Sequence, residues 1–257
     1  MYKILAIGNS FSEDATYYLH QILEHSGIEN QVVNLYIGGC SLERHWQNIE
    51  NDRRDYLFEI NGQKTDRYVT VSEVLKETKW DVVVTQQASH DSGWSDTYEP
   101  FLGLMVDYLH EKAGDALIYL HETWAYAKDS DHDHFMRYHR DQKEMYDRLK
   151  ANYSQMALKY RLPLIPSGDL IQNLRETTFF NEENGDFAIC RDGYHMNYLY
   201  GRFALACMWA RSICKVDLKK NGYVPVTDYM PFEVAKPEIL DRIKEIVMEL
   251  DAKDQDI

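Results

Sequence analysis

MYKILAIGNSFSEDA, residues 1–15, turns from apolar to polar at Gly8. Residues 2–7 predict a buried strand, and residues 12–26 carry apolar side chains at helical spacing. Ser10 lies between these two segments. A serine at the end of a strand and just before a helix is either a helix cap or a nucleophile. The second role needs partners, which the rest of the chain must supply.

Strands and helices are predicted to alternate along the whole chain. Further strands are expected at residues 31–37, 81–85, 115–121 and 162–165, and further helices at residues 71–78, 100–112, 135–160, 167–174, 197–213 and 236–250. The Asn61-Gly62 pair predicts a β-hairpin over residues 56–70. This alternation predicts a three-layer α/β/α sandwich with a mostly parallel sheet. No repeat or linker divides the sequence, so we expect a single domain over residues 1–257.

Composition excludes several classes of protein. The 257 residues carry a net charge of −14, which argues against nucleic acid or an anionic membrane as the main partner. No run of 18 apolar residues predicts a membrane span. No secretory signal precedes the first strand, so the chain as given is expected to be cytoplasmic, or exported if a signal peptide has been removed. The four cysteines form no C-x-x-C pair.

Chemically distinctive residues follow the predicted strands. In parallel sheets, ligands bind outside the carboxyl ends of the strands. Ser10 follows the first strand and Gly39 the second, while Asp192 and His195 stand just before a late helix. A serine needs a base to become a nucleophile, histidine suits that role near neutral pH, and a carboxylate orients the histidine. A glycine N–H can approach a developing oxyanion closely.

In their order and position, these segments resemble the SGNH hydrolases. GNSFS at residues 8–12 is similar to the nucleophile block of that family, with Asn9 where aspartate is usual. NLYIGG at residues 34–39 resembles the second block, and DGYH at residues 192–195 matches the final D-x-x-H block. The resemblance implies a flavodoxin-like sheet and a Ser10, His195 and Asp192 triad. Ser12, which is followed by acidic residues, is then the better candidate for the helix cap.

The third family block, G-x-N-D, is altered here. QQASHDSG at residues 86–93 places His90 where the family has the asparagine whose side chain completes the oxyanion hole. His90 is the positional match, and Gln87 is the closer chemical match. By resemblance, the oxyanion hole consists of the N–H groups of Ser10 and Gly39 with either His90 or Gln87. Loss of one such donor typically costs about 10²- to 10³-fold in rate, so activity can survive the change.

The resemblance implies an ester hydrolase that needs no cofactor and acts on a small-molecule or carbohydrate ester, most often an O-acetyl group on a carbohydrate. Trp124, Tyr126 and Trp94 are candidates to line the substrate pocket, or else they pack in the core. A lipase-like or thioesterase-like activity fits the same triad. A weakly catalytic carbohydrate-binding module would fit the altered third block.

The segment DSDHDH, residues 129–134, offers a further alternative. Its acidic and histidine side chains, with His121 and His139 nearby, suggest a metal-dependent hydrolase. The spacing is not that of a zinc-binding helix, and a solvated acidic loop has the same composition. No metal site is therefore predicted.

Overall fold

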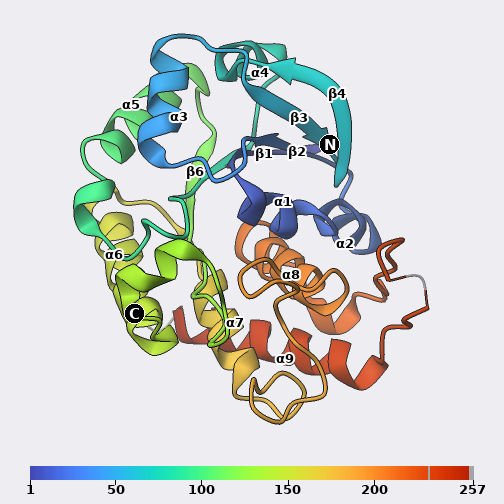
Figure 1. Cartoon of the computed structure of the whole chain (residues 1–257). Coiled ribbons are helices and arrows are strands. Elements are labelled where there is room, and N and C mark those ends of the chain that lie inside the picture. Colours follow the sequence, from blue (N-terminus) through green and yellow to red (C-terminus); the bar gives the residue numbers. More distant parts are fainter. Residues whose placement is uncertain (231, 255–257) are drawn as a thin grey trace.

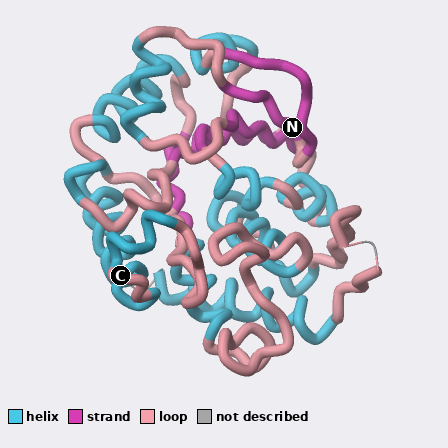
Figure 2. The backbone as a smooth tube through the Cα atoms, viewed as in Figure 1, coloured by secondary structure: helices cyan, strands magenta, loops and turns pink. Residues whose placement is uncertain are grey.

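The architecture of the chain is a central β-sheet covered by helices on both faces (Figures 1 and 2). This is a computed structural model, which describes residues 1–230 and 232–254. Within them, seven strands form one sheet in the order β4-β3-β2-β1-β5-β6-β7. The bounds are β1 Tyr2–Gly8, β2 Asn30–Tyr36, β3 Tyr56–Ile60, β4 Gln63–Val69, β5 Val82–Thr85, β6 Leu117–His121 and β7 Leu164–Ile165. The predicted α/β sandwich with a mostly parallel sheet is confirmed.

The five strands β2, β1, β5, β6 and β7 are parallel and follow the flavodoxin-like order. The last two residues of β1, Ile7 and Gly8, pair with Leu35 and Tyr36 of β2. Ile7 also pairs with Thr85 of β5. The segments that follow these three strands therefore all start at the carboxyl ends of the parallel strands. These segments contain the polar and glycine residues that stand out in the sequence.

Two layers of helices enclose the sheet. Helices α1, α2 and α8 pack together on one side with α9 outside α8, and α3, α4 and α5 pack on the other (Figure 1). The bounds are α1 Ser10–Thr16, α2 Leu19–His25, α3 Leu42–Glu50, α4 Val71–Glu77, α5 Phe101–Lys112, α6 Gln142–Tyr160, α7 Ser167–Arg175, α8 Tyr200–Cys214 and α9 Pro237–Asp254. In the part of the chain that is described, no helix combines the length and apolar character that crossing a bilayer would demand.

Two helix predictions were wrong in detail. The segment predicted as one helix over residues 12–26 is divided into α1 and α2. The predicted helix over residues 135–160 begins instead as a 3₁₀ turn, Asp133–Tyr138, which ends in the left-handed conformation at His139 before α6 begins. The spacing of apolar residues in the sequence does not reveal these interruptions, because apolar side chains continue on both sides of each one.

The predicted hairpin at residues 56–70 is confirmed as β3 and β4. Asn61 and Gly62 have positive φ angles of 51° and 78°, as a tight turn of this kind requires. β3 pairs antiparallel with β2, so the hairpin extends the sheet at the edge beside the second strand. Lys64 of β4 pairs with Glu59, and its Nζ lies 5.3 Å from the ring centroid of Tyr36, the last residue of β2.

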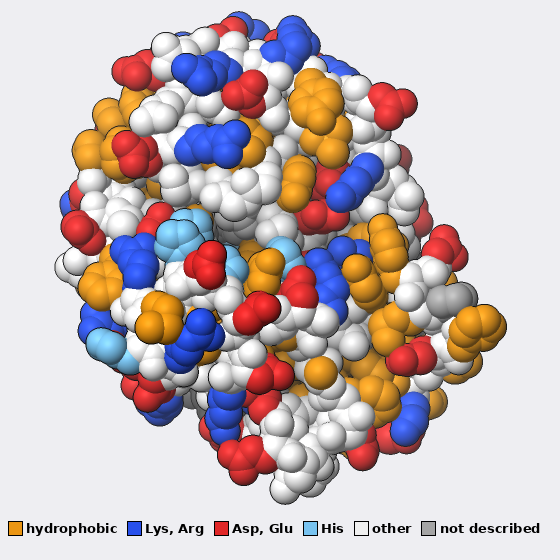
Figure 3. Space-filling model, in the orientation of Figure 1, with side chains coloured by type: hydrophobic (Ala, Val, Ile, Leu, Met, Phe, Trp, Pro, Cys, Tyr) orange, Lys and Arg blue, Asp and Glu red, His pale blue; other side chains and the backbone are white. Residues whose placement is uncertain are grey.

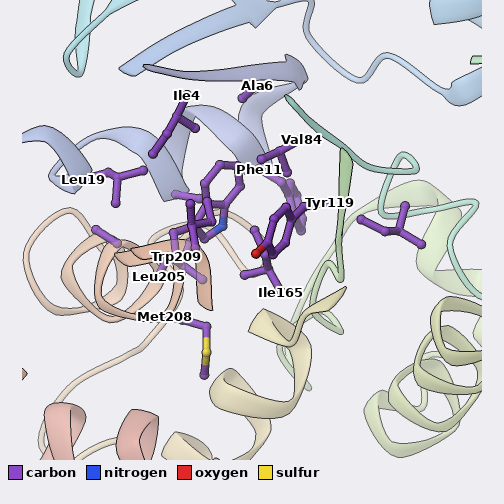
Figure 4. Close-up of a cluster of buried hydrophobic side chains, with 14 of the residues drawn as sticks. Ile4, Ala6, Phe11, Leu19, Val84, Tyr119, Ile165, Leu205, Met208 and Trp209 are labelled. Carbon is purple, nitrogen blue, oxygen red and sulfur yellow. The ribbon is translucent and has the colours of Figure 1, made fainter. Parts of the chain in front are cut away.

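Apolar side chains from β1 and β5 meet those of α1 and α8 beneath the segment that carries Ser10. Figure 4 shows Ile4 and Val84 from the sheet, Phe11 and Leu19 from the N-terminal helices, and Trp209 from α8 gathered in one cluster. These side chains are at most 2% exposed. The start of α1 is therefore held on a well-packed support, which fixes the position of Ser10.

Candidate active site

Ser10 is the first residue of α1 and lies immediately beyond the end of β1. The turn between strand and helix needs a residue without a side chain, because a Cβ at Gly8 would lie 2.5 Å from Ser12 Oγ. Asn9 caps the helix by accepting a hydrogen bond from the Phe11 N–H at 3.0 Å. The expectation that Ser12 is the cap is wrong, since its buried hydroxyl donates to Asn9 O and Asn34 Oδ1. Ser10 is left free for another role.

The structure brings Ser10, His195 and Asp192 into one hydrogen-bonded array. Ser10 Oγ lies 2.8 Å from His195 Nε2, and His195 Nδ1 lies 2.6 Å from Asp192 Oδ2. Asp192 Oδ1 also accepts the backbone N–H of His195 at 2.7 Å. The two oxygens of one carboxylate thus fix both the backbone and the ring of the histidine, with its Nε2 toward Ser10.

The ionisation of Asp192 suits this arrangement. Partial burial acts to raise its pKa, but the hydrogen bonds from the His195 ring and backbone outweigh burial, so the pKa lies below the usual value. The carboxyl group is therefore ionised at neutral pH. An ionised carboxylate holds the proton on Nδ1 of His195 and leaves Nε2 to accept the Ser10 proton.

Ser10 and Gly39, whose backbone N–H groups are the expected oxyanion donors, both line the cavity, and Gly39 has a φ of +60°. Within the described residues, neither N–H donates a hydrogen bond to another group. A side chain at position 39 would find open space, so the left-handed backbone is what favours glycine here.

The two candidates for the third oxyanion donor lie in different places. His90 lines the cavity together with Ala88 and Ser89. The Gln87 side chain is fully buried, and its amide nitrogen donates to Thr97 O and Thr97 Oγ1 at 2.8 and 3.1 Å. Its oxygen accepts the N–H groups of Leu42 and Ala88. Gln87 therefore joins two loops and is not presented to the cavity.

The cavity beside Ser10 has a volume of about 450 Å³ and lies within the range of small-molecule sites. Four tyrosines line it, and sequence reasoning missed all of them: Tyr36, Tyr194, Tyr198 and Tyr229. Tyr198 and Tyr229 stack on each other with ring centroids 4.4 Å apart. Tyr194 lies within the D-x-x-H block and Tyr36 lies within the second block, so position in a motif was the available signal for these two.

The predicted pocket residues Trp124, Tyr126 and Trp94 do not line this cavity. Trp124 is fully buried, stacks on Phe11 with ring centroids 4.0 Å apart, and donates its indole N–H to Tyr194 O at 2.7 Å. Its place is under the loop that carries His195. Tyr126 is also buried, and Trp94 is half-buried with the guanidinium groups of Arg137 and Arg148 5.0 and 4.7 Å from its ring centroid. Strand-end position alone did not reveal that the Trp124 and Tyr126 rings turn inward.

A second feature that the sequence did not reveal is a buried carboxylate that joins α1 to the His195 loop. Asp14 Oδ2 accepts the Met196 N–H at 2.8 Å, and its Oδ1 accepts Arg202 Nε at 2.8 Å. Arg191 Nη1 lies 3.0 Å from both oxygens. Arg191 in turn donates its backbone N–H to His195 O at 2.9 Å. We call this group the Asp14 clamp; it ties the helix that begins with Ser10 to the loop of its histidine.

Behind Ser10, a chain of buried polar side chains crosses the strand ends. Asn9 Oδ1 accepts from Gln86 Nε2 at 2.8 Å, Gln86 Oε1 lies 2.7 Å from His121 Nδ1, and His121 Nε2 lies 3.0 Å from Ser167 Oγ. Full burial lowers the pKa of His121 to about 3. The ring is therefore neutral at pH 7 and serves to hold Gln86, and through it Asn9, in place.

This histidine predicts a pH dependence of stability. Between pH 3 and pH 6.5 the unfolded chain binds a proton at His121 that the folded chain rejects, so folding stability falls as the pH is lowered. In urea unfolding, His121→Gln should reduce the loss of stability between pH 7 and pH 5 by about 2 kcal/mol. His110→Gln, on the exposed side of α5, should leave the pH dependence as it is in the wild type. An unchanged pH dependence in His121→Gln would contradict the assignment.

The acidic segment at residues 129–134 lies beside the cavity. His132 lines the cavity, and the His134 ring stacks on His90 with centroids 4.6 Å apart. Among the side chains that the structure describes, no three histidine, cysteine or acidic groups come together as a metal site would need. His121 takes part in the buried polar chain instead.

The chain belongs to the family described as a domain of unknown function (DUF4886), whose model matches residues 3–236. A crystal structure of a member from Bacteroides uniformis is 36% identical in sequence, covers 96% of this chain and 93% of its own, and superposes with a TM-score of 0.86. A search of curated proteins gives no match.

More distant solved structures share the fold. A proposed SGNH hydrolase from Slackia heliotrinireducens is 20% identical, with a TM-score of 0.57 and coverage of 82% of this chain and 98% of its own. A catalytic mutant of Axe2, an acetylxylan esterase from Geobacillus stearothermophilus, is 13% identical, with a TM-score of 0.51 and coverage of 88% and 97%. The architecture is thus that of the SGNH hydrolases.

Proposed function

We propose that the protein is a serine esterase in which Ser10 is the nucleophile, His195 the general base and Asp192 the group that orients it. The observation that carries the proposal is the continuous array from Ser10 Oγ through the His195 ring to Asp192, with distances of 2.8 and 2.6 Å. The array opens onto a cavity at the carboxyl ends of the parallel strands, where ligands bind in such sheets.

The geometry supports a two-step acyl transfer. Ser10 Oγ attacks the ester carbonyl carbon while His195 Nε2 takes the hydroxyl proton, and the carbonyl oxygen becomes an oxyanion. The N–H groups of Ser10 and Gly39 stabilise that charge. His195 then delivers the proton to the leaving alcohol. A water molecule, deprotonated by the same histidine, releases the acid and restores Ser10.

We propose His90, rather than Gln87, as the third donor to the oxyanion. Burial lowers the pKa of His90; Asp91 acts in the opposite direction, and His134, His132 and Arg137 lower the pKa further. The ring is therefore neutral at pH 7 and carries one N–H to donate. Support comes from its place on the cavity wall and from the sequence, in which it stands where the family has the asparagine.

His90→Ala is accordingly expected to lower kcat about 10²- to 10³-fold with a smaller change in KM, because an oxyanion donor acts mainly in the transition state. Steady-state hydrolysis of p-nitrophenyl acetate measures both constants. His134→Ala, which removes the ring stacked on His90, is the matched control and should keep kcat within about tenfold. If His90→Ala has the wild-type kcat, His90 is not the third donor to the oxyanion.

For the substrate, we propose a small O-acyl group, acetate in the first place, on a carbohydrate. The support is the tyrosine-lined cavity, whose size suits a sugar ester, and the name of a structural neighbour as an acetylxylan esterase. Charged side chains share the lining, which disfavours a long acyl chain. A lipase-like or thioesterase-like enzyme remains the alternative within the same mechanism.

Acyl length and leaving group separate these alternatives. The wild type should hydrolyse an O-acetylated methyl xyloside and p-nitrophenyl acetate, and kcat/KM should fall steeply from the acetate to the octanoate. Faster hydrolysis of the octanoate would contradict the proposed substrate class and favour a lipase-like enzyme. Faster hydrolysis of acetyl thioesters would likewise favour a thioesterase-like enzyme. If Ser10→Ala and the wild type hydrolyse all of these substrates at the same background rate, the binding-module alternative is favoured.

A further inference from the structure

The cavity beside Ser10 is basic, although the chain as a whole is acidic. The chain has a net charge of −14. Among the described residues that line the cavity, Lys64, Arg191 and Arg202 are cationic, and Glu13 is the single carboxylate. Figure 3 shows histidine side chains gathered at the centre of this face with basic side chains beside them. A basic cavity in an acidic protein is expected to attract anions selectively.

The nearby carboxylates do not neutralise these three cations. Glu13 lies 2.8 Å from Lys64 Nζ and 4.0 Å from Arg202 Nη2. Asp14 serves Arg191 and Arg202 within the clamp. Among the described residues, the carboxylates paired with these three cations are thus two, Glu13 and Asp14, which leaves the cations in excess within this group. The ionised Asp192 pairs with His195 instead.

Two further observations agree with this excess. The Arg202 side chain is only 3% exposed, and in the described part of the chain its Nη1 has no hydrogen-bond partner. Glu59, which interacts electrostatically with Lys64 and Arg202, is buried, and burial raises its pKa to about 7 although a hydrogen bond from Asn34 acts against that. It is therefore only partly ionised at neutral pH and adds less than a full negative charge.

The same end of the cavity has tyrosine rings. Lys64 Nζ lies 5.3 Å from the centroid of the Tyr36 ring, and the guanidinium of Arg202 lies 4.9 and 5.7 Å from those of Tyr198 and Tyr229. Aromatic faces beside a cation suit a sugar ring that carries an anionic group, because the rings contact the C–H faces and the cation pairs with the charge.

We propose that the end of the cavity formed by Lys64, Arg202 and their tyrosines binds a carboxylate on the substrate, so that the preferred substrate is an O-acyl ester of an acidic sugar, of the uronic acid class. The proposal rests on the esterase function proposed above. Lys64 is the direct contact, since its side chain is 54% exposed, whereas Arg202 acts from beneath the tyrosines.

Two matched esters test this preference. O-acetylated methyl glucuronoside and O-acetylated methyl glucoside differ only at C6, which is a carboxylate in the first. At low ionic strength, kcat/KM for the acidic ester should exceed that for the neutral one about tenfold or more, as an added charged hydrogen bond allows. The preference should decrease as salt screens the pair. Equal values, or a preference for the neutral ester, would overturn the proposal.

Lys64→Gln should reduce the acidic-to-neutral ratio of kcat/KM by about tenfold. Lys79→Gln is the matched control, because it removes the same charge from a side chain that is 74% exposed. Lys79 lies just before β5, at the amino end of that strand, whereas the cavity lies at the carboxyl ends. It should leave the ratio at its wild-type value. A Lys64→Gln variant with the wild-type ratio would contradict the assignment of the carboxylate contact.

A binding measurement separates failure of the site from failure of the proposed esterase. Ser10→Ala should bind methyl glucuronoside, which has no ester, at least tenfold more tightly than methyl glucoside in an NMR titration. If neither ester is hydrolysed but the acidic sugar binds selectively, the esterase function is wrong and the anion site stands. If both esters are hydrolysed alike and neither sugar binds selectively, the anion site is wrong and the esterase stands.

Discussion

Ser10→Ala is expected to lower kcat for p-nitrophenyl acetate by about 10⁴- to 10⁶-fold, which is the effect of removing the nucleophile from a serine hydrolase triad. The reason is that the Ser10 hydroxyl is the group aligned with His195 Nε2 at 2.8 Å and exposed to the cavity. The measurement is steady-state hydrolysis at pH 7 to 8, with the variant's fold checked by circular dichroism.

Ser12→Ala is the matched control for this substitution. It removes the same hydroxyl two residues away, but Ser12 is buried and bonded to Asn9 O and Asn34 Oδ1. A loss of hydrogen bonding there costs stability of about 1–3 kcal/mol and leaves the reacting groups in place. Wild-type rates in Ser10→Ala, or the large loss in Ser12→Ala instead, would contradict the assignment of the nucleophile.

Asp14→Ala is expected to have the largest effect on stability. It leaves the buried guanidinium of Arg202 and that of Arg191 without their carboxylate, and breaking a buried pair in this way costs about 3–5 kcal/mol. Urea unfolding measures the loss. Asp147→Ala, which breaks the exposed pair with Lys143 on α6, should cost about 1 kcal/mol or less.

The same substitution tests whether the Asp14 clamp positions the histidine. Without it, the loop of His195 is tied less firmly to α1, and a misplacement of about 1 Å lowers the rate about 10²-fold. We therefore expect kcat per folded molecule to fall by about that factor with little change in KM. A folded Asp14→Ala variant with the wild-type kcat would show that the Asp14 clamp stabilises the fold and does not position the catalytic groups.

The parts of the site that follow directly after strands, or lie within a few residues of each other, could be predicted from sequence. Asp192 and His195 are three residues apart, so local backbone geometry brings carboxylate and imidazole together. Ser10 and Gly39 follow neighbouring parallel strands, and the alternation of strands and helices sets the edge at which they meet. The order of the blocks thus carried the triad hypothesis.

The remaining parts depend on tertiary packing that a single sequence does not express. Asp14 is bonded to Arg191 at a separation of 177 residues, and no local pattern marks that pairing. Whether an aromatic ring after a strand faces a cavity or the core depends on what packs above it, and Trp124 is covered by Phe11 and the His195 loop. Gln87 matched the missing asparagine chemically but turns toward Thr97.

A covalent adduct tests the central claim most directly. After incubation with a fluorophosphonate, peptide mass spectrometry should find one phosphonyl group on Ser10, formed with loss of fluoride, in the wild type and in Ser12→Ala. His195→Ala should react much more slowly, because the Ser10 proton then has no acceptor at 2.8 Å. Esterase activity that persists with Ser10 unlabelled, or a label on another residue that abolishes activity, would contradict the account.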